Sequence, residues 1–354
     1  MNDLRVIVTA CGAPGGPGII KALRQVTERE IRIIGVDANA MASGLLLADE
    51  GHVVPEAASD SYVGAMAELA HTVGADAILP LSGTELLPLS RSLDQFPGTK
   101  VVVNRTSALE IALDKQRSYA FLDGRVAIPA HRAVRTYPEF VEAVRALGYP
   151  QVPVCFKPSV SKGQRGFRVL REDVDLRGLL LETKPDSTTT TLDQVAPILS
   201  QGFDPELLVS EYLPGMEYSV DSLVAGGETL TMVPRARRQT RSGISSVGVV
   251  EKDEAVMSAA EEINRAFEFD YNINVQLKYS TDGVPKLVEI NPRVSGTICL
   301  SVAAGPNLPY LAIKQALGEP LAIPDVEWGV VMIRYWDELY LKGSPSFDAV
   351  QPHG

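Results

Sequence analysis

Short apolar strands that alternate with helices fill the first hundred residues, and this order constrains the fold more than any other feature. "RVIVTA" (5–10) predicts a buried strand, and "GIIKALRQV" (18–26) predicts a helix after a Gly/Pro turn. The same order continues through "IRIIGVD" (31–37) to "KVVVN" (100–104). Buried strands joined by helices indicate a doubly wound parallel sheet. We expect this α/β domain to close near residue 105.

The pattern changes after this first domain. The stretch 106–124 begins with a Thr/Ser N-cap and predicts one linking helix. From about residue 130 strands and helices no longer alternate strictly, which indicates an α+β fold. Residues 182–206 are polar and contain Pro and Gly, so we interpret them as a mobile loop or insertion, with an inert surface excursion as the alternative.

Composition narrows the class of protein. The formal net charge of -11 over 354 residues argues against a broad nucleic-acid or anionic-membrane surface. No apolar run approaches the roughly 20 residues that span a bilayer, and no signal peptide is visible. Cys11, Cys155 and Cys299 form no CxxC pair, which suits a reducing compartment. We expect a soluble, cytoplasmic protein.

A hairpin near the end of the chain brings oxygen ligands together. Asp282-Gly283 between two alternating runs predicts a tight turn. If these are the two loop residues, Gln276 lies opposite Glu289 and Asn291 shares their face, while Val288 and Ile290 are buried on the other. Oxygen ligands with one carboxylate suit Mg²⁺, which completes its shell with waters and phosphates. The alternative is a polar, solvent-facing side of an edge hairpin.

A flexible loop follows an apolar strand in the middle of the chain. Lys157 ends the run "VPVCFKP", and a Ser/Gly stretch leads to a second strand from Phe167. Backbone N–H groups in such a loop can surround phosphate oxygens, and the lysine adds a point charge. The Walker A pattern is absent, and a plain hairpin loop is the alternative.

Together these motifs resemble those of ATP-grasp enzymes. The run from Lys157 to Gly166 is similar to their phosphate-binding loop, and "LVEINPRV" is similar to the metal-binding strand of the carbamoyl-phosphate synthetase large subunit. The order also matches: a first domain with "GGPG", "DK" at 114–115, the lysine loop, "SEYLPGMEYSVD" and the metal strand. The resemblance covers residue 4 to about 320. It implies an ATP-grasp fold, in which two subdomains clasp ATP.

The resemblance assigns roles residue by residue. ATP and Mg²⁺, with Mn²⁺ as a substitute, are the implied cofactors. Arg293 matches the arginine that faces the transferred phosphoryl group. This loop has Ser161, Lys162 and Gln164, whereas the family loop is often richer in glycine, which lets the backbone approach phosphate closely. Direct phosphate contact through Lys162 and Arg165 is therefore an alternative. The implied nucleotide contacts are Lys115, Lys157, Ser161, Lys162, Gly163, Arg165, Gly166, Glu211, Tyr212, Leu213 and Glu217, and the implied metal ligands are Gln276, Glu289 and Asn291.

The resemblance implies a ligase that joins small molecules. A carboxylate attacks the γ-phosphate of ATP, ADP leaves, and an amine or thiol displaces phosphate from the acyl phosphate. "VPRARRQTR" supplies Arg235 and Arg237, which share one face of a strand and could clamp substrate carboxylate or phosphoryl oxygens. The alternative is a solvated basic loop. A homodimer is a further expectation, because dimers are frequent among such ligases.

Three functions are alternatives to a ligase. The turn "CGAPGGPG" followed by Asp37 is typical of dinucleotide binding, but its spacing is not GxGxxG, so we discount an oxidoreductase. A carbamate or carboxyphosphate kinase and a nucleotide sensor without turnover are the others.

The expected divisions are 1–105, the α/β domain; 106–150, a linker helix and the start of the ATP-grasp fold; 151–212, a lid subdomain; 213–323, the subdomain with the metal site; and 324–354, a C-terminal strand and tail.

Overall fold

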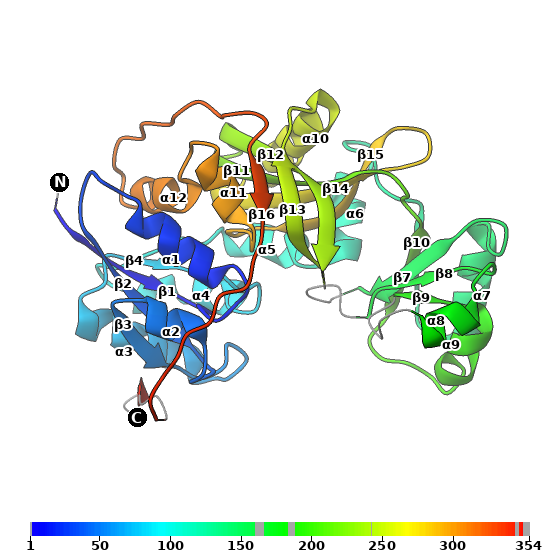
Figure 1. The fold of residues 1–354 in the computed structure, drawn as a ribbon, viewed down its shortest axis with the longest axis horizontal. Coiled ribbons are helices and arrows are strands. Elements are labelled where there is room, and N and C mark those ends of the chain that lie inside the picture. The colour runs from blue at the N-terminus through cyan, green and yellow to red at the C-terminus, as the bar shows by residue number, and fades with distance from the viewer. Residues whose placement is uncertain (1, 160–165, 183–187, 242, 344–346, 350–354) are drawn as a thin grey trace.

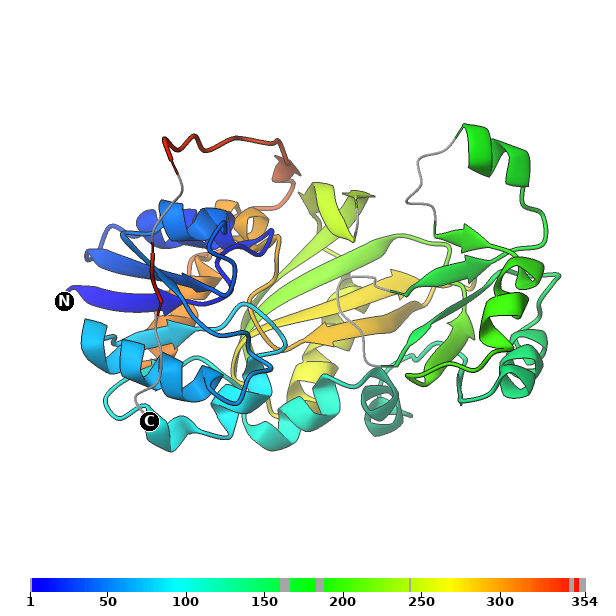
Figure 2. The same cartoon turned by 90° about the horizontal axis from the view of Figure 1, so that it is seen from below.

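Three sheets follow one another along the molecule (Figures 1 and 2). The computed structural model describes residues 2–159, 166–182, 188–241, 243–343 and 347–349. A parallel sheet lies at one end, a large antiparallel sheet in the centre and a small mixed sheet at the other end. The predicted order, a doubly wound α/β domain followed by α+β, is confirmed.

The parallel sheet has the strand order β17-β3-β2-β1-β4-β5. Its strands are apolar because both faces are covered: Val6 packs on the side of α1 and α2, and Ile7 on the side of α3 and α4. The elements are β1 (Leu4–Val8), α1 (Gly16–Arg24), β2 (Ile31–Asp37), α2 (Ser43–Leu47), β3 (Glu50–Val53), α3 (Tyr62–Val73), β4 (Ala77–Leu79), α4 (Leu86–Ser90), a 3₁₀ turn (Leu93–Gln95) and β5 (Lys100–Val101).

The linking stretch forms two helices, α5 (Thr106–Ala112) and α6 (Lys115–Leu122), so the prediction of one helix is wrong. Asp114 interrupts the first helix and caps the second, because its side chain accepts from the backbone N–H groups of Gln116 and Arg117. The cap places Lys115 at the first position of α6, where it is buried.

The small sheet has the order β6-β10-β7-β8-β9. The prediction of a mobile loop over 182–206 is wrong where the structure describes it, because a strand and a helix form there. Thr191 and Gln194 make a reciprocal capping box at the start of that helix. The elements are β6 (His131–Val134), α7 (Tyr137–Ala146), β7 (Val154–Pro158), β8 (Arg168–Leu170), α8 (Leu176–Leu181), β9 (Thr189–Thr190), α9 (Leu192–Leu199) and β10 (Leu207–Glu211).

The large sheet is antiparallel, in the order β15-β14-β11-β12-β13-β16. One face packs on α6 and α10 through alternate apolar residues such as Val220 and Val275. The opposite face carries the polar alternates, and it holds the candidate site. The elements are β11 (Glu217–Ala225), β12 (Glu228–Arg241), β13 (Ile244–Val250), α10 (Glu254–Phe267), β14 (Tyr271–Tyr279), β15 (Pro285–Asn291), α11 (Ile298–Ala303), α12 (Leu308–Ala316) and β16 (Val331–Ile333).

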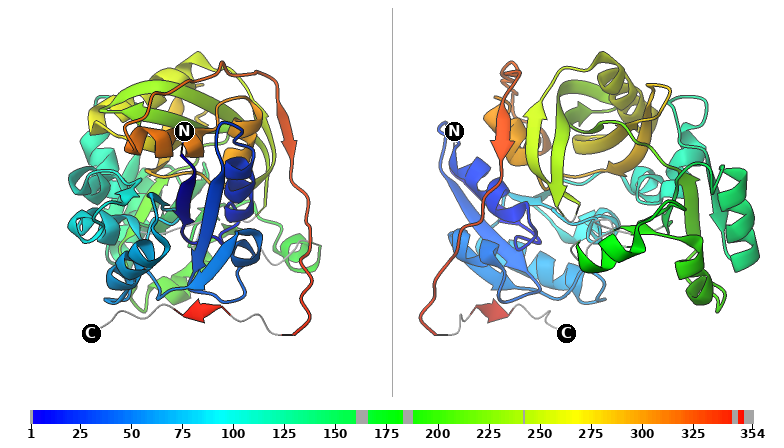
Figure 3. Two further views of the ribbon diagram at one scale, coloured as in Figure 1. Left: turned by 90° about the vertical axis from the view of Figure 1, so that its left-hand side faces the viewer. Right: turned by 45° about the vertical axis from the view of Figure 1, so that its right-hand side comes forward.

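The first domain and the large sheet share one hydrophobic core. Ile19 and Leu23 of α1 join the same buried cluster as Ile298 of α11 and Leu311 of α12. The predicted C-terminal strand is confirmed as β16, which pairs with β13 (Figure 3). The stretch expected to be a tail also contains a strand, β17 (Asp348–Ala349), which pairs in parallel with β3.

Candidate active site

The β14–β15 hairpin places the predicted oxygen ligands side by side. Gln276 pairs with Glu289, as predicted. The prediction of a two-residue turn is wrong, because Tyr279 pairs with Pro285, which leaves residues 280–284 as the loop. An extra residue at Val288, a β-bulge, restores the predicted register beyond it.

The bulge also changes which residues are buried. Leu287 and Ile290 are buried, whereas Val288, predicted to be buried, is partly exposed. The carbonyl oxygens of the bulge accept bonds from two other elements. Lys157 Nζ lies 3.4 Å from the Val288 oxygen, and Tyr119 Oη lies 3.3 Å from the same oxygen.

Glu289, Asn291 and Gln276 lie on the polar face of the sheet, each partly exposed. Arg293, just past the end of β15, donates to Asn291 Oδ1 over 3.0 Å. Burial lowers the pKa of Arg293, and the negative charges of Glu289, Glu85 and Asp221 oppose that effect. The Arg293 guanidinium thus lies close enough to Glu289, a predicted metal ligand, for the charge of that carboxylate to affect the pKa of Arg293.

The two predicted lysines come from different elements and lie close enough for the charge of one to affect the pKa of the other. Lys157 comes from β7 of the small sheet and Lys115 from α6. Burial, and after it the charge of Lys115, lower the pKa of Lys157 to about 8, although the charges of Glu289 and Glu217 act in the opposite direction. Two cations that influence each other across the start of a loop form a suitable place for phosphates.

The loop itself is described only at its ends. Ser161, Lys162, Gly163 and Arg165 lie outside the described residues. At the described end, Gly166 has a positive φ of 75°, and a Cβ there would lie 2.6 Å from Pro158 Cδ. Glycine is therefore needed where the loop returns past the end of β7.

The predicted adenine segment, Glu211 to Leu213, joins the small sheet to the large one. Glu211 Oε1 lies 2.5 Å from Lys286 Nζ. The Tyr212 ring faces two cations, Arg171 at 5.2 Å and Lys278 at 5.5 Å from its centroid. Leu213 is buried.

The predicted ribose acid, Glu217, forms an ion pair with Arg237. Arg237 also donates to Ser245 Oγ over 3.0 Å and to the Gly243 oxygen over 2.5 Å. Arg237 is buried, so the alternative of a solvated basic loop is wrong for this residue.

Arg235 is also buried and lies on the same face. Its Nη2 lies 2.7 Å from Asp221 Oδ2 and donates to Ser295 Oγ over 2.9 Å. Asp221 is not among the residues predicted for the site, although a carboxylate inside an apolar strand is an unusual signal. The other groups that hold this pair are Ser219, Asn274 and Ser301.

The N-terminal glycine turn packs against the loop that follows β15. A Cβ on Gly15 would lie 2.6 Å from Gly296 Cα, and one on Gly16 would lie 2.0 Å from the Cys11 oxygen. Gly296, in the loop after β15, therefore occupies the space in front of Gly15, which argues further against a dinucleotide site there.

With this geometry in place, the known families can be compared. The family described as "ATP-grasp in the biosynthetic pathway with Ter operon" matches residues 203–335, and the PylC-like N-terminal domain matches residues 6–103. Residues 203–335 belong to the ATP-grasp superfamily. The first match spans β10 to β16 with the oxygen ligands, and the second spans the parallel sheet from β1 to β5.

Relatives of this chain are distant. Carnosine synthase 1 of Gallus gallus is 31% identical over 141 residues, which cover 36% of this chain and 15% of that protein. The carbamoyl phosphate synthase large chain of Thermus thermophilus is 26% identical over 262 residues, 69% of this chain and 23% of that protein. The chain thus spans less than a quarter of either relative.

A solved structure shares the fold. The ADP complex of N5-carboxyaminoimidazole ribonucleotide synthetase superposes with a TM-score of 0.70 at 16% identity, covering 93% of this chain and 80% of that one.

Proposed function

We propose that the chain is an ATP-dependent carboxylate–amine ligase that forms an acyl phosphate and releases ADP and phosphate. One observation carries the proposal: Gln276 and Glu289 face each other beside Asn291, at the point where Lys157 contacts the same strand. Metal ligands, a phosphate-binding lysine and Arg293 would then meet at the end of β15.

The donor set fits a magnesium ion. Among the described residues no group of three or more His, Cys, Asp or Glu side chains could hold a metal. Gln276, Glu289 and Asn291 instead offer one carboxylate and two amide oxygens, which suits an ion that keeps waters and binds nucleotide phosphates. The bound ion would neutralise phosphate charge.

The side chains would position the reaction. A substrate carboxylate oxygen bonds to the γ-phosphorus while the bond from that phosphorus to the ADP oxygen breaks. Lys115 and Lys157 would hold the phosphate oxygens, and Arg293 would stabilise the acyl phosphate. The amine nitrogen then bonds to the acyl carbon, phosphate leaves with the C–O electrons, and the nitrogen loses a proton.

Other predicted contacts complete the site. The segment of Glu211, Tyr212 and Leu213 would hold adenine, and Glu217, oriented by Arg237, would accept the ribose hydroxyls. Arg235, fixed by Asp221, would hold a positive charge toward the substrate. In this proposal the lid of 151–212 closes over the subdomain of 213–323.

Product analysis tests the ligase proposal. Nucleotide products would be measured with Mg-ATP and pooled carboxylates and amines, with bicarbonate alone as a separate arm. We expect ADP and phosphate only when a carboxylate and an amine are both present. AMP would contradict the acyl-phosphate route, and ADP with bicarbonate alone would favour the carboxyphosphate kinase. Nucleotide binding without turnover in any arm would favour the sensor.

A further inference from the structure

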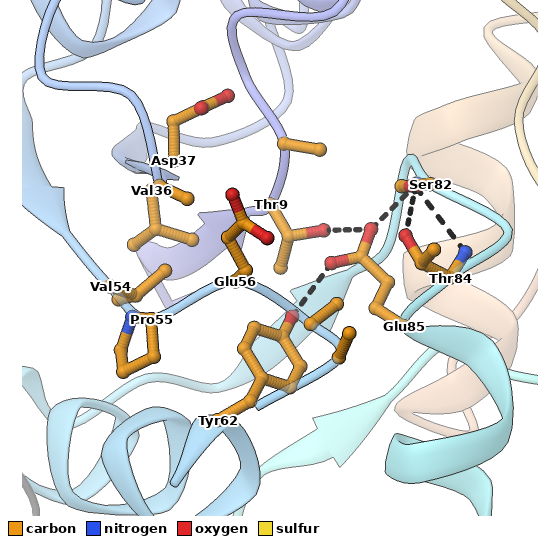
Figure 4. A pocket seen from close by; sticks show the side chains of 14 residues that line it. Thr9, Val36, Asp37, Val54, Pro55, Glu56, Tyr62, Ser82, Thr84 and Glu85 are labelled. Carbon is orange, nitrogen blue, oxygen red and sulfur yellow. Dashed lines mark hydrogen bonds between the residues drawn. The ribbon is translucent and has the colours of Figure 1, made fainter. Parts of the chain in front are cut away.

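A cavity of about 230 Å³ lies in the N-terminal domain, at the carboxyl ends of its parallel strands (Figure 4). Its walls come from the residues that follow or end β1, β2, β3 and β4, together with Tyr62 at the start of α3. In the sheet, β2 and β3 lie on one side of β1, and β4 and β5 lie on the other, so the strand order reverses at β1. Ligands of doubly wound sheets bind at such a point, outside the carboxyl ends of the strands. The volume equals roughly eight water molecules, so a small molecule or one end of it would fit.

The lining sets the charge of a ligand. Three carboxylates face the cavity, from Asp37, Glu56 and Glu85, and the lining contains no lysine, arginine or histidine. Phosphates and carboxylates would be repelled here. A positively charged group with several hydrogen-bond donors matches the walls.

Glu85 forms a fixed floor. It is 2% exposed and accepts four hydrogen bonds: from Thr9 Oγ1 at 2.6 Å, Tyr62 Oη at 2.7 Å, and the backbone N–H groups of Leu81 and Ser82 at 2.9 and 2.6 Å. Burial raises the pKa of Glu85 above its ordinary value, and these donors offset part of that rise. Four donors aimed at one side chain favour its carboxylate form.

Asp37 and Glu56 differ in how they are held. Asp37 accepts from the backbone N–H groups of Gly12 at 2.8 Å and Asn39 at 2.9 Å, so both its oxygens are fixed. The Glu56 side chain is exposed and has no hydrogen-bond or ion-pair partner among the described residues. Figure 4 shows its carboxylate over the cavity, between Asp37 and Tyr62. Glu56 is therefore free to turn onto a ligand that the other walls already hold in place.

The cavity adjoins the proposed reaction centre. The charge of Glu85 acts on Arg293, the residue proposed to stabilise the acyl phosphate. The glycine turn beside the cavity packs on Gly296, three residues after Arg293. A small molecule held at one end by the cavity would thus extend toward the end of β15.

We propose that this cavity binds the ammonium group of one of the two substrates, held by Glu85, Asp37 and Glu56. The statement that the bound group belongs to a substrate rests on the proposed ligase function, whereas the binding itself rests on the cavity alone. The ammonium group belongs either to the acceptor amine or to an amino acid whose carboxylate is activated.

Binding without nucleotide tests the inference. Saturation-transfer NMR with the purified chain would use L-alanine, β-alanine, L-lysine and putrescine, each beside its analogue without the amino group. We expect at least one amino compound to bind about tenfold more tightly than its analogue, and to lose that advantage in Glu56→Gln. This side chain is exposed and unpartnered, so the variant should fold normally. Asp94→Asn, an exposed acid of the same domain outside the cavity, is the control and should bind as the wild type does.

The outcomes separate the two proposals. If every amino compound binds no better than its analogue, or if Glu56→Gln and Glu85→Gln both bind as the wild type does, the cavity assignment is wrong whatever the enzyme's reaction. If binding behaves as expected but ATP yields AMP, the ligase mechanism fails and the ammonium site stands. Trapping with hydroxylamine then distinguishes the sources, because only a substrate whose own carboxylate becomes an acyl phosphate is converted to a hydroxamate.

Discussion

At the scale of single residues, the site depends on cations that the fold partly removes from water. Lys157 illustrates this, because it is half-buried near Lys115 and its ammonium group contacts a backbone oxygen of β15. Burial penalises the charged form, so the free protein holds this proton less firmly than an exposed lysine would. Phosphates would restore the balance by supplying negative charge.

The pH dependence of nucleotide binding follows from Lys157. Its pKa is lowered from 10.5 to about 8 in the folded chain, so the lysine is charged below pH 8 and loses its proton as the pH rises through that value. We expect the affinity for Mg-ADP to fall roughly tenfold from pH 7 to pH 9, with proton uptake on binding at the higher pH. Calorimetric titration in buffers of different ionisation enthalpy measures both quantities. Lys157→Arg should remove the pH dependence, because arginine stays charged, and an equal fall in this variant would contradict the assignment.

At the scale of elements, the β-bulge at Val288 decides which residues of β15 reach the site. The loop of residues 280–284 alone would leave the strand one residue out of register, and the bulge corrects it. Tyr119 of α6 stabilises the bulge, since its hydroxyl lies 3.2 Å from the Leu287 oxygen and 3.3 Å from the Val288 oxygen.

Removing that hydroxyl tests the role of the bulge. Tyr119→Phe keeps the buried ring and removes a buried donor, which should cost about 1 kcal/mol of unfolding free energy. We also expect a lower kcat, because Glu289 would be held less firmly, and this is measured by urea unfolding and steady-state ADP release. Tyr137→Phe, a tyrosine outside this contact, is the control. Unchanged stability and rate in Tyr119→Phe would show that the bulge does not depend on this hydroxyl.

Much of the fold and part of the site follow from local sequence. The alternating apolar runs predict the parallel sheet. The pairing of Gln276 with Glu289 was predicted from a two-residue turn at Asp282-Gly283, and it holds because the bulge at Val288 offsets the longer loop. The capping box of Thr191 and Gln194 was also present in the sequence, but the surrounding polar residues masked it in the pattern. Asp114 is likewise a residue that favours a helix start, and the prediction of one continuous helix over 106–124 did not use it.

The rest depends on contacts between distant segments. The bulge at Val288 is held by Tyr119 and Lys157, which no property of residues 285–291 reveals. The pair of Arg235 and Asp221 exists because β11 lies beside β12 in the sheet. Glu85 reads as one polar residue in a turn until the fold surrounds it with four donors.

At the scale of the whole molecule, the N-terminal domain and the central sheet pack closely against each other. They share a hydrophobic core, and the N-terminal glycine turn contacts the loop after β15 without side chains between them. Among the described residues, no helix is long and apolar enough to cross a membrane.

The contact between these domains can be tested by adding one methyl group. In Gly15→Ala the new Cβ would lie 2.6 Å from Gly296 Cα, so the two backbones must separate. We expect Tm to fall by about 3 °C or more and kcat/KM to fall with it. In the control Gly18→Ala, the Cβ meets Cys299 at an ordinary 3.4 Å and alanine favours the helix, so Tm should hold or rise. A wild-type Tm in Gly15→Ala would mean that the domains do not meet at this turn.

The most direct test of the central claim, that β14 and β15 hold a metal–nucleotide complex, is calorimetric binding of ADP with Mg²⁺ and with EDTA. It requires no knowledge of the substrates. We expect Mg²⁺ to tighten ADP binding at least tenfold in the wild type and in Glu261→Gln, an exposed control on α10, and to have little effect in Glu289→Ala. Equal affinity with and without Mg²⁺ in the wild type, or an intact metal effect in Glu289→Ala, would contradict the claim.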